Sequence, residues 1–141
     1  MNIARHLALI DELCFRPFPA KHGPSAVGEG PGYHLVVLER SQGDRGTRAT
    51  TVEQYEKDRD ALYELLALRW GDTDPLNLQT TLLRTAREEI PEPWASLSAR
   101  ARVAHLWKAE GTGRWVAVAV ADRDEADDVR LLAVVTEVDP P

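Results

Sequence analysis

The sequence predicts a single α+β domain over residues 1–141, in which helices pack on a mainly antiparallel sheet of about four strands. Two observations support this prediction: three apolar runs follow one another closely in the last third of the chain, and helical hydrophobic patterns occupy much of the rest. The expected strands are residues 33–39, 103–109, 115–122 and 129–138. The expected helices are residues 2–14, 51–70 and 75–88.

The middle of the three C-terminal runs, residues 115–122, alternates between valine and small or aromatic side chains. Successive side chains of a strand point to opposite faces, so Val116, Val118 and Val120 share one face and Ala117 and Ala119 lie on the other. A strand with one wet face would carry polar residues at every second position, and this one carries none. We therefore expect a central strand that is covered on both sides.

The two neighbouring runs are expected to pair with this central strand. A glycine-containing turn at residues 110–113 joins 103–109 to 115–122, and an acidic loop at residues 123–128 leads to 129–138. Such short connections favour an antiparallel meander. The strand at residues 33–39 is rich in β-branched side chains and should join the same sheet.

The helices are predicted from hydrophobic spacing and from capping residues. Asn2 is a candidate N-cap for the first helix, and Thr50 with Glu53 has the form of a capping box for the second. Gly71 is placed to end that second helix in a left-handed conformation. Most charged residues of the second helix, including Asp58, are expected on the face opposite its leucines.

The segment between these elements is harder to assign. Asp74 and Pro75 resemble a helix start, although Leu76 and Leu78 also allow a period-two, strand-like interpretation. The proline-rich residues 90–94 are expected to be extended, with a short helical turn at 96–100. Residues 16–32 contain four prolines and four glycines, which is typical of a loop.

Composition limits the classes of function. The chain has 43% hydrophobic and 28% charged residues and a net charge of −6, which is ordinary for a water-soluble domain. Residues 1–70 hold 9 basic and 10 acidic side chains, whereas residues 71–141 hold 8 and 13. This acidic balance disfavours nucleic acid, and no apolar run is long enough for a membrane helix. A single cysteine, Cys14, and no export-like start favour a cytoplasmic protein. Arginine outnumbers lysine 14 to 3, which is typical of high-GC bacterial coding.

No motif of the sequence predicts a catalytic residue, a metal ligand or a cofactor. The four histidines are far apart, and Cys14 lies on an apolar helix face where it should be inert. The glycines at residues 28–32 precede a strand and include a proline, so they do not fit a phosphate-binding loop. Five carboxylates in residues 122–128 could bind calcium, but a solvated hairpin tip explains them as well.

The best candidates for a binding surface are aromatic and cationic. Tryptophans with nearby arginine are typical of binding hot spots, and they are equally typical of a core that contains little phenylalanine. The candidate residues are Trp94, Trp107, Trp115, Arg114 and His105.

The sequence establishes no function and shows no resemblance to a known family. We expect a small non-enzymatic protein-binding or accessory module of the adaptor, antitoxin or immunity type, which binds another protein or itself as a homodimer. The alternative is a small-ligand-binding or enzymatic domain with a cleft near residues 23–33, from Gly23 to Tyr33, in which His34 and His105 would take part. A third hypothesis, nucleic-acid binding, uses five arginines: Arg40, Arg45, Arg48, Arg84 and Arg87.

Overall fold

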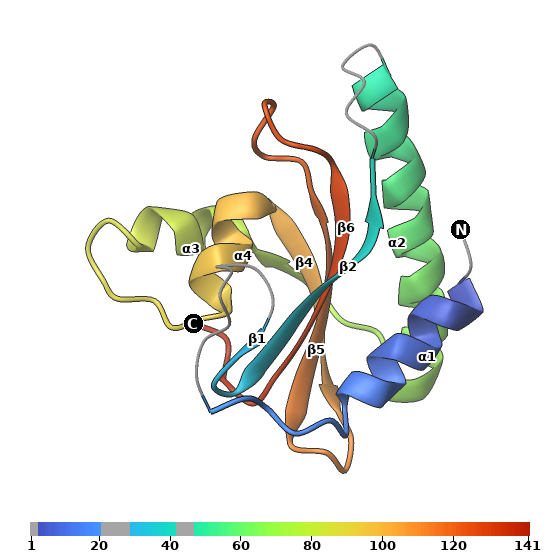
Figure 1. Ribbon diagram of the computed structural model, residues 1–141, viewed down its shortest axis with the longest axis vertical. Helices are drawn as coiled ribbons and strands as arrows, with labels where there is room; N and C mark the ends of the chain where they lie inside the picture. Colours follow the sequence, from blue (N-terminus) through green and yellow to red (C-terminus); the bar gives the residue numbers. More distant parts are fainter. Residues whose placement is uncertain (1–2, 21–28, 42–46) are drawn as a thin grey trace.

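The computed structural model describes residues 3–20, 29–41 and 47–141, and these form a sheet between two helical layers (Figure 1). The six-stranded antiparallel sheet has the order β1-β2-β6-β5-β4-β3. Helices α1 and α2 cover one face, and α3 and α4 cover the other. The strands are β1 (Glu29–Gly30), β2 (Tyr33–Arg40), β3 (Pro75–Asn77), β4 (Val103–Ala109), β5 (Arg114–Ala121) and β6 (Arg130–Thr136). The helices are α1 (Ile3–Leu13), α2 (Arg48–Trp70), α3 (Leu78–Arg84) and α4 (Trp94–Arg100).

The α+β class and the antiparallel meander are confirmed. The four expected strands are β2, β4, β5 and β6, with bounds that differ from the prediction by at most two residues. The sheet is larger than expected because two very short strands, β1 and β3, extend its edges. None of the helices in the described residues is long and apolar enough to cross a membrane.

Strand β5 is central and buried on both faces, as the alternation of its residues predicts. Val116, Val118 and Val120 pack with residues of α1 and α2 in one core cluster. Ala117 and Ala119 pack in a second cluster that includes Trp94 and the other buried residues of α4. Small side chains on this second face leave room for the indole of Trp94, which is fully buried.

Helix α2 begins earlier than predicted, because its N-cap is Thr47 rather than Thr50. The capping box is therefore wrong: Thr50 lies inside the helix, and no side chain caps the first turn. Instead, the guanidinium of Arg48 donates hydrogen bonds of 2.6–3.0 Å to three backbone carbonyls of the acidic loop between β5 and β6. The predicted end of the helix is confirmed, since Gly71 has a positive φ of 91° and its N–H donates to the Ala67 carbonyl, but its ψ of 169° lies outside the left-handed helical region.

The predicted helix at residues 75–88 is wrong at both ends. Pro75–Asn77 form strand β3, in which Pro75 pairs with His105 at the edge of the sheet, where a missing N–H is tolerated. Helix α3 is only seven residues long and starts after Asn77, whose side chain accepts a hydrogen bond from the Gln79 amide at 2.9 Å. The period-two interpretation was the correct one for the start of this segment.

The prediction of an extended segment at residues 90–94 is wrong for its second half, because residues 92–93 form a turn and α4 begins at Trp94. The Glu92–Pro93 peptide bond before it is cis. The predictions for Asn2, for the glycines of residues 21–28 and for Arg45 lie outside the described residues.

Candidate functional site

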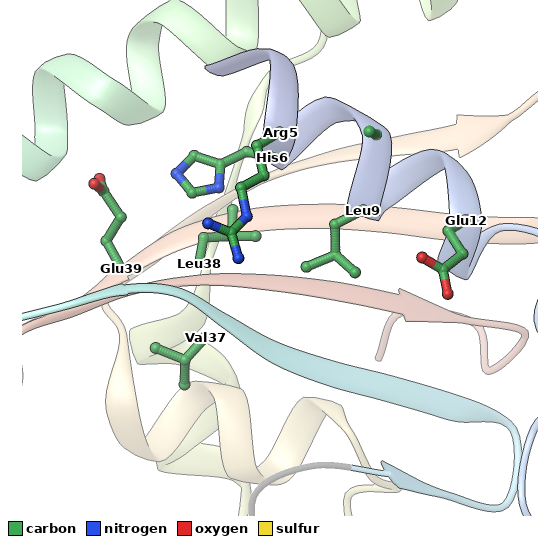
Figure 2. Close-up of a pocket in the computed structure, with 8 residues that line it drawn as sticks. Arg5, His6, Leu9, Glu12, Val37, Leu38 and Glu39 are labelled. Carbon is green, nitrogen blue, oxygen red and sulfur yellow. The ribbon is translucent and has the colours of Figure 1, made fainter. Parts of the chain in front are cut away.

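An open groove of about 590 Å³ lies between α1 and β2 (Figure 2). One wall is a stripe of α1 with the spacing of a single helix face: Arg5, Ala8, Leu9 and Glu12. This stripe is about 10 Å long at the rise of an α-helix. The other wall is the strand segment Val37, Leu38 and Glu39, and His6 completes the lining.

The strand that forms this wall has an open edge among the described residues. Strand β1 pairs only with Tyr33 and His34, whereas β2 continues to Arg40. From Leu35 onward, no described strand lies on the side of β2 that faces away from β6. In an antiparallel ladder, half of the backbone N–H and C=O groups of such a strand point outward and are available for another strand.

A β-bulge in β2 decides which side chains face the helices. Val37 pairs with Leu132 and Glu39 with Leu131, so Leu38 is the additional residue. Strict alternation would place Leu38 and Glu39 on opposite faces, but the bulge brings both to the side of α1 and α2. The Val37 side chain points to the other side of the strand and is 40% exposed (Figure 2).

Glu39 lies beside a second carboxyl group, that of Asp58 on α2. Asp58 is 7% exposed and accepts a hydrogen bond from Gln54 Nε2 at 2.9 Å. Glu39 Oε2 is shielded from solvent and has no hydrogen-bond donor among the described residues, unless one of the two carboxyl groups carries a proton. Burial, and then the hydrogen bond and negative charge of Asp58, raise the pKa of Glu39 to about 7. Glu39 is therefore partly protonated near neutral pH.

His6 adds a third buried polar group at the same place. Its side chain extends from α1 on the same side of β2 as the Glu39 carboxyl (Figure 2). The residue is 7% exposed, and its Nε2 has no hydrogen-bond partner among the described residues. Burial lowers the pKa of His6, which the negative charge of Asp58 opposes, so the imidazole is favoured in its neutral form.

These three groups form the buried polar cluster, defined here as His6, Glu39 and Asp58. A neutral histidine can accept a hydrogen bond, and a carboxyl group with a raised pKa can exchange its proton for a cation. The described residues contain no group of three or more His, Cys, Asp or Glu side chains arranged to hold a metal ion.

The tryptophans singled out from the sequence divide between core and surface. Trp94 is fully buried, and its Nε1 donates to the Val138 carbonyl at 3.0 Å. Trp107 is 3% exposed on the opposite face of the sheet, where its Nε1 donates to the Gly71 carbonyl at 2.9 Å. Both indoles serve packing in this structure and present no surface to a partner.

The other three candidate residues are partly exposed but do not form one surface. The Arg114 guanidinium lies over the Phe18 ring and donates to the Leu13 carbonyl at 2.7 Å, so it ties the end of α1 to β5. The Lys108 ammonium lies over the Trp115 ring, 4.6 Å from the ring centroid. His105 packs edge-on against Tyr63 at the other edge of the sheet, and burial lowers its pKa.

The remaining sequence candidates have structural partners. His34 is fully buried, and its ring centroid lies 4.9 Å from that of Phe18. Cys14 is also buried, which raises the pKa of its thiol. Arg40 pairs with Asp128 at 3.0 Å and Arg84 with Glu88 at 2.9 Å. The described arginines of the nucleic-acid hypothesis are thus largely engaged with the chain itself.

The residues that sequence reasoning missed are His6, Glu39 and Asp58. Asp58 follows Tyr55 by three positions and precedes Leu62 by four, so the helical period places it on the buried face of α2. That spacing was visible in the sequence. The position of Glu39 was not, because it depends on the bulge at Leu38.

Comparison with known proteins finds no matching family, no matching curated protein and no matching solved structure.

Proposed function

We propose that this chain is a non-enzymatic protein-binding module whose groove between α1 and β2 receives an extended segment of a partner protein. The observation that carries the proposal is the open edge of β2 beneath a helix stripe. An added strand would pair with the backbone of residues 35–37, and its side chains would alternate between the groove and the Val37 side. With one buried free cysteine, the chain suits a reducing compartment such as the cytoplasm.

The groove supports this function better than a binding surface made of tryptophans. The combination of a strand edge and a neighbouring helix face supplies backbone hydrogen bonds for affinity and a side-chain pocket for specificity. Exposed apolar side chains in the groove wall would also be buried by a partner, because Val37 is 40% exposed and Leu9 is partly exposed.

The test uses a displayed library of extended octapeptides and a matched pair of variants on α1. Ala4 and Ala8 are both exposed, but only Ala8 lines the groove. We expect selected peptides to bind the wild type and Ala4→Trp, to lose binding to Ala8→Trp, and to protect amides of β2 from hydrogen exchange. Peptides that bind Ala8→Trp as well as the wild type, or that protect only other strands, would refute the proposal. A library that yields no binder would count against it equally.

A further inference from the structure

The buried polar cluster at one end of the groove is the part of the molecule that packing alone does not explain. Buried polar atoms in folded proteins are almost always hydrogen-bonded, and an exception asks for an explanation. Here His6 Nε2 is shielded from solvent without a hydrogen-bond partner among the described residues, and the shielded Glu39 Oε2 has only the Asp58 carboxyl group beside it. Both residues line the groove, so a bound group could reach them.

We propose that the partner segment carries a lysine or arginine side chain, and that this cation enters the groove beside Glu39 and Asp58 and pairs with the Glu39 carboxylate. The inference rests on the proposed function and specifies the partner that the groove recognises. It follows from charge complementarity: two carboxyl groups lie together, and no basic side chain is paired with either of them in the contacts that the structure shows.

The surroundings of the pair fit a cation better than an anion. The charges that act on Glu39 are those of Asp58 and of the N-terminus of the chain, and Tyr55 of α2 lies close to both carboxyl groups. His6 of α1 lies close to Asp58. His6 is favoured in its neutral form, so its Nε2 can accept a hydrogen bond from an ammonium or guanidinium group. Arg5 is exposed at the rim of the groove, outside the buried part of the cluster.

The geometry also explains why the residue would come from an extended segment. The bulge at Leu38 ends the regular register of β2, which is continuous from Tyr33 to Val37. A strand added to residues 35–37 would therefore stop at the bulge, close to where Glu39 turns toward α2. A long basic side chain near the end of that strand could cover the remaining distance, since lysine and arginine carry flexible hydrocarbon stems.

The exchange is balanced in charge and in protons. Before binding, Glu39 is about half protonated at pH 7, because its pKa is raised to about 7. On binding, the side-chain cation takes the place of that proton, which is released to solvent, and Glu39 is then ionised. Binding at pH 7 should therefore release about half a proton, and affinity should rise with pH across the titration of Glu39.

The closing experiment compares two forms of one octapeptide selected on the wild type: the peptide with its lysine or arginine, and the same peptide with norleucine there. Binding is measured by calorimetry in two buffers of different ionisation enthalpy, which also gives the number of protons released. We expect norleucine to weaken binding to the wild type by at least about tenfold, as for the loss of a buried charge partner. In Asp58→Asn the difference should shrink to about threefold or less.

Glu12→Gln is the matched control, because Glu12 lines the same groove but is exposed and paired with Arg16. It should keep the full difference between the two peptides. As a probe of the cation site alone, n-butylammonium should shift the side-chain carboxyl resonance of Glu39, whereas n-butyrate should not.

The outcomes separate the inference from the function on which it rests. Peptides that bind in the groove without a basic residue, or equal binding of the norleucine form, would overturn the inference and leave the proposed function standing. A preference for n-butyrate would overturn it as well. Concentration-dependent self-association that protects β2 without any peptide would show that a second copy, and not a partner peptide, occupies the edge. Failure of every peptide to bind would overturn both.

Discussion

The substitution Glu39→Gln isolates the energetic effect of the buried carboxyl pair. The carboxyl of Glu39 has a pKa of about 7 in the folded protein, against an ordinary value of 4.5. A pKa difference of one unit corresponds to about 1.4 kcal/mol, so the difference between 4.5 and about 7 sets an upper limit of about 3 kcal/mol on the change in the free energy of unfolding. Glu39 is partly exposed, and solvent screening reduces this to about 1–2 kcal/mol.

The sign follows from the direction of the pKa. A carboxyl group whose pKa is raised by folding binds more protons in the folded state, so the free energy of unfolding falls as pH rises from about 4.5 to about 7. Glutamine has the same shape without the ionisation. We therefore expect Glu39→Gln to have nearly the stability of the wild type at pH 4.5, and to be more stable by about 1–2 kcal/mol at pH 8.

The assay is urea unfolding of both proteins at half-unit steps between pH 4.5 and 8. His6 acts in the opposite direction, because burial lowers its pKa, but it is present in both proteins and largely cancels in the difference. Glu64→Gln, at an exposed position on α2, is the control for replacing a glutamate by glutamine on the surface. A constant difference for Glu39→Gln over the same range would refute the reasoning, because it would mean that Glu39 titrates normally.

Three further predictions concern the packing that supports the groove. Leu66 is fully buried and Leu68 is 85% exposed on the same helix, so Leu66→Ala should cost about 2–5 kcal/mol in urea unfolding and Leu68→Ala less than about 0.5. Arg48→Ala removes the hydrogen bonds to the acidic loop, so it should lower the free energy of unfolding by about 1–2 kcal/mol and speed amide exchange at residues 122–128. Arg87→Ala, at an exposed position, should change neither the free energy of unfolding nor the amide exchange of this loop. Ala119→Leu should cost about 1–3 kcal/mol by overpacking the closely covered face of β5, and thermal unfolding that shows no loss would contradict the packing described here.

The parts of the fold that could be predicted are those where one sequence pattern allows one structure. The valine and alanine alternation of β5 has no polar face, so burial on both sides was the only consistent outcome. Gly71 marked the end of α2 for a similar reason, since its positive φ suits glycine. Predictions failed where a local signal fits two structures. Pro75 begins helices as readily as it occupies the edge of a sheet, and pairing with β4 decided between them.

The candidate site could be predicted less well, because it depends on contacts between distant segments. The bulge at Leu38 leaves no mark in the local sequence, yet it turns Glu39 toward α2. How deeply the His6 side chain is buried depends on how α1 lies against the sheet, and the hydrophobic spacing of the helix does not specify this. The prediction for Asp58 was wrong: it was expected on the face opposite the leucines, although its spacing from Leu62 places it on the buried face.

The two edges of the sheet show why the groove forms beside β2. At the far edge, three-residue β3 covers only part of β4, but Lys108 is exposed on the remainder, and a lysine on an open edge discourages the addition of another strand. At the near edge, two-residue β1 covers even less of β2, and Val37 lies there exposed instead of a lysine. Among the described residues, one edge thus carries a lysine and the other is open next to the carboxyl groups of Glu39 and Asp58. A cation brought by a partner would offset the cost of burying that pair, which gives the open edge a reason to persist.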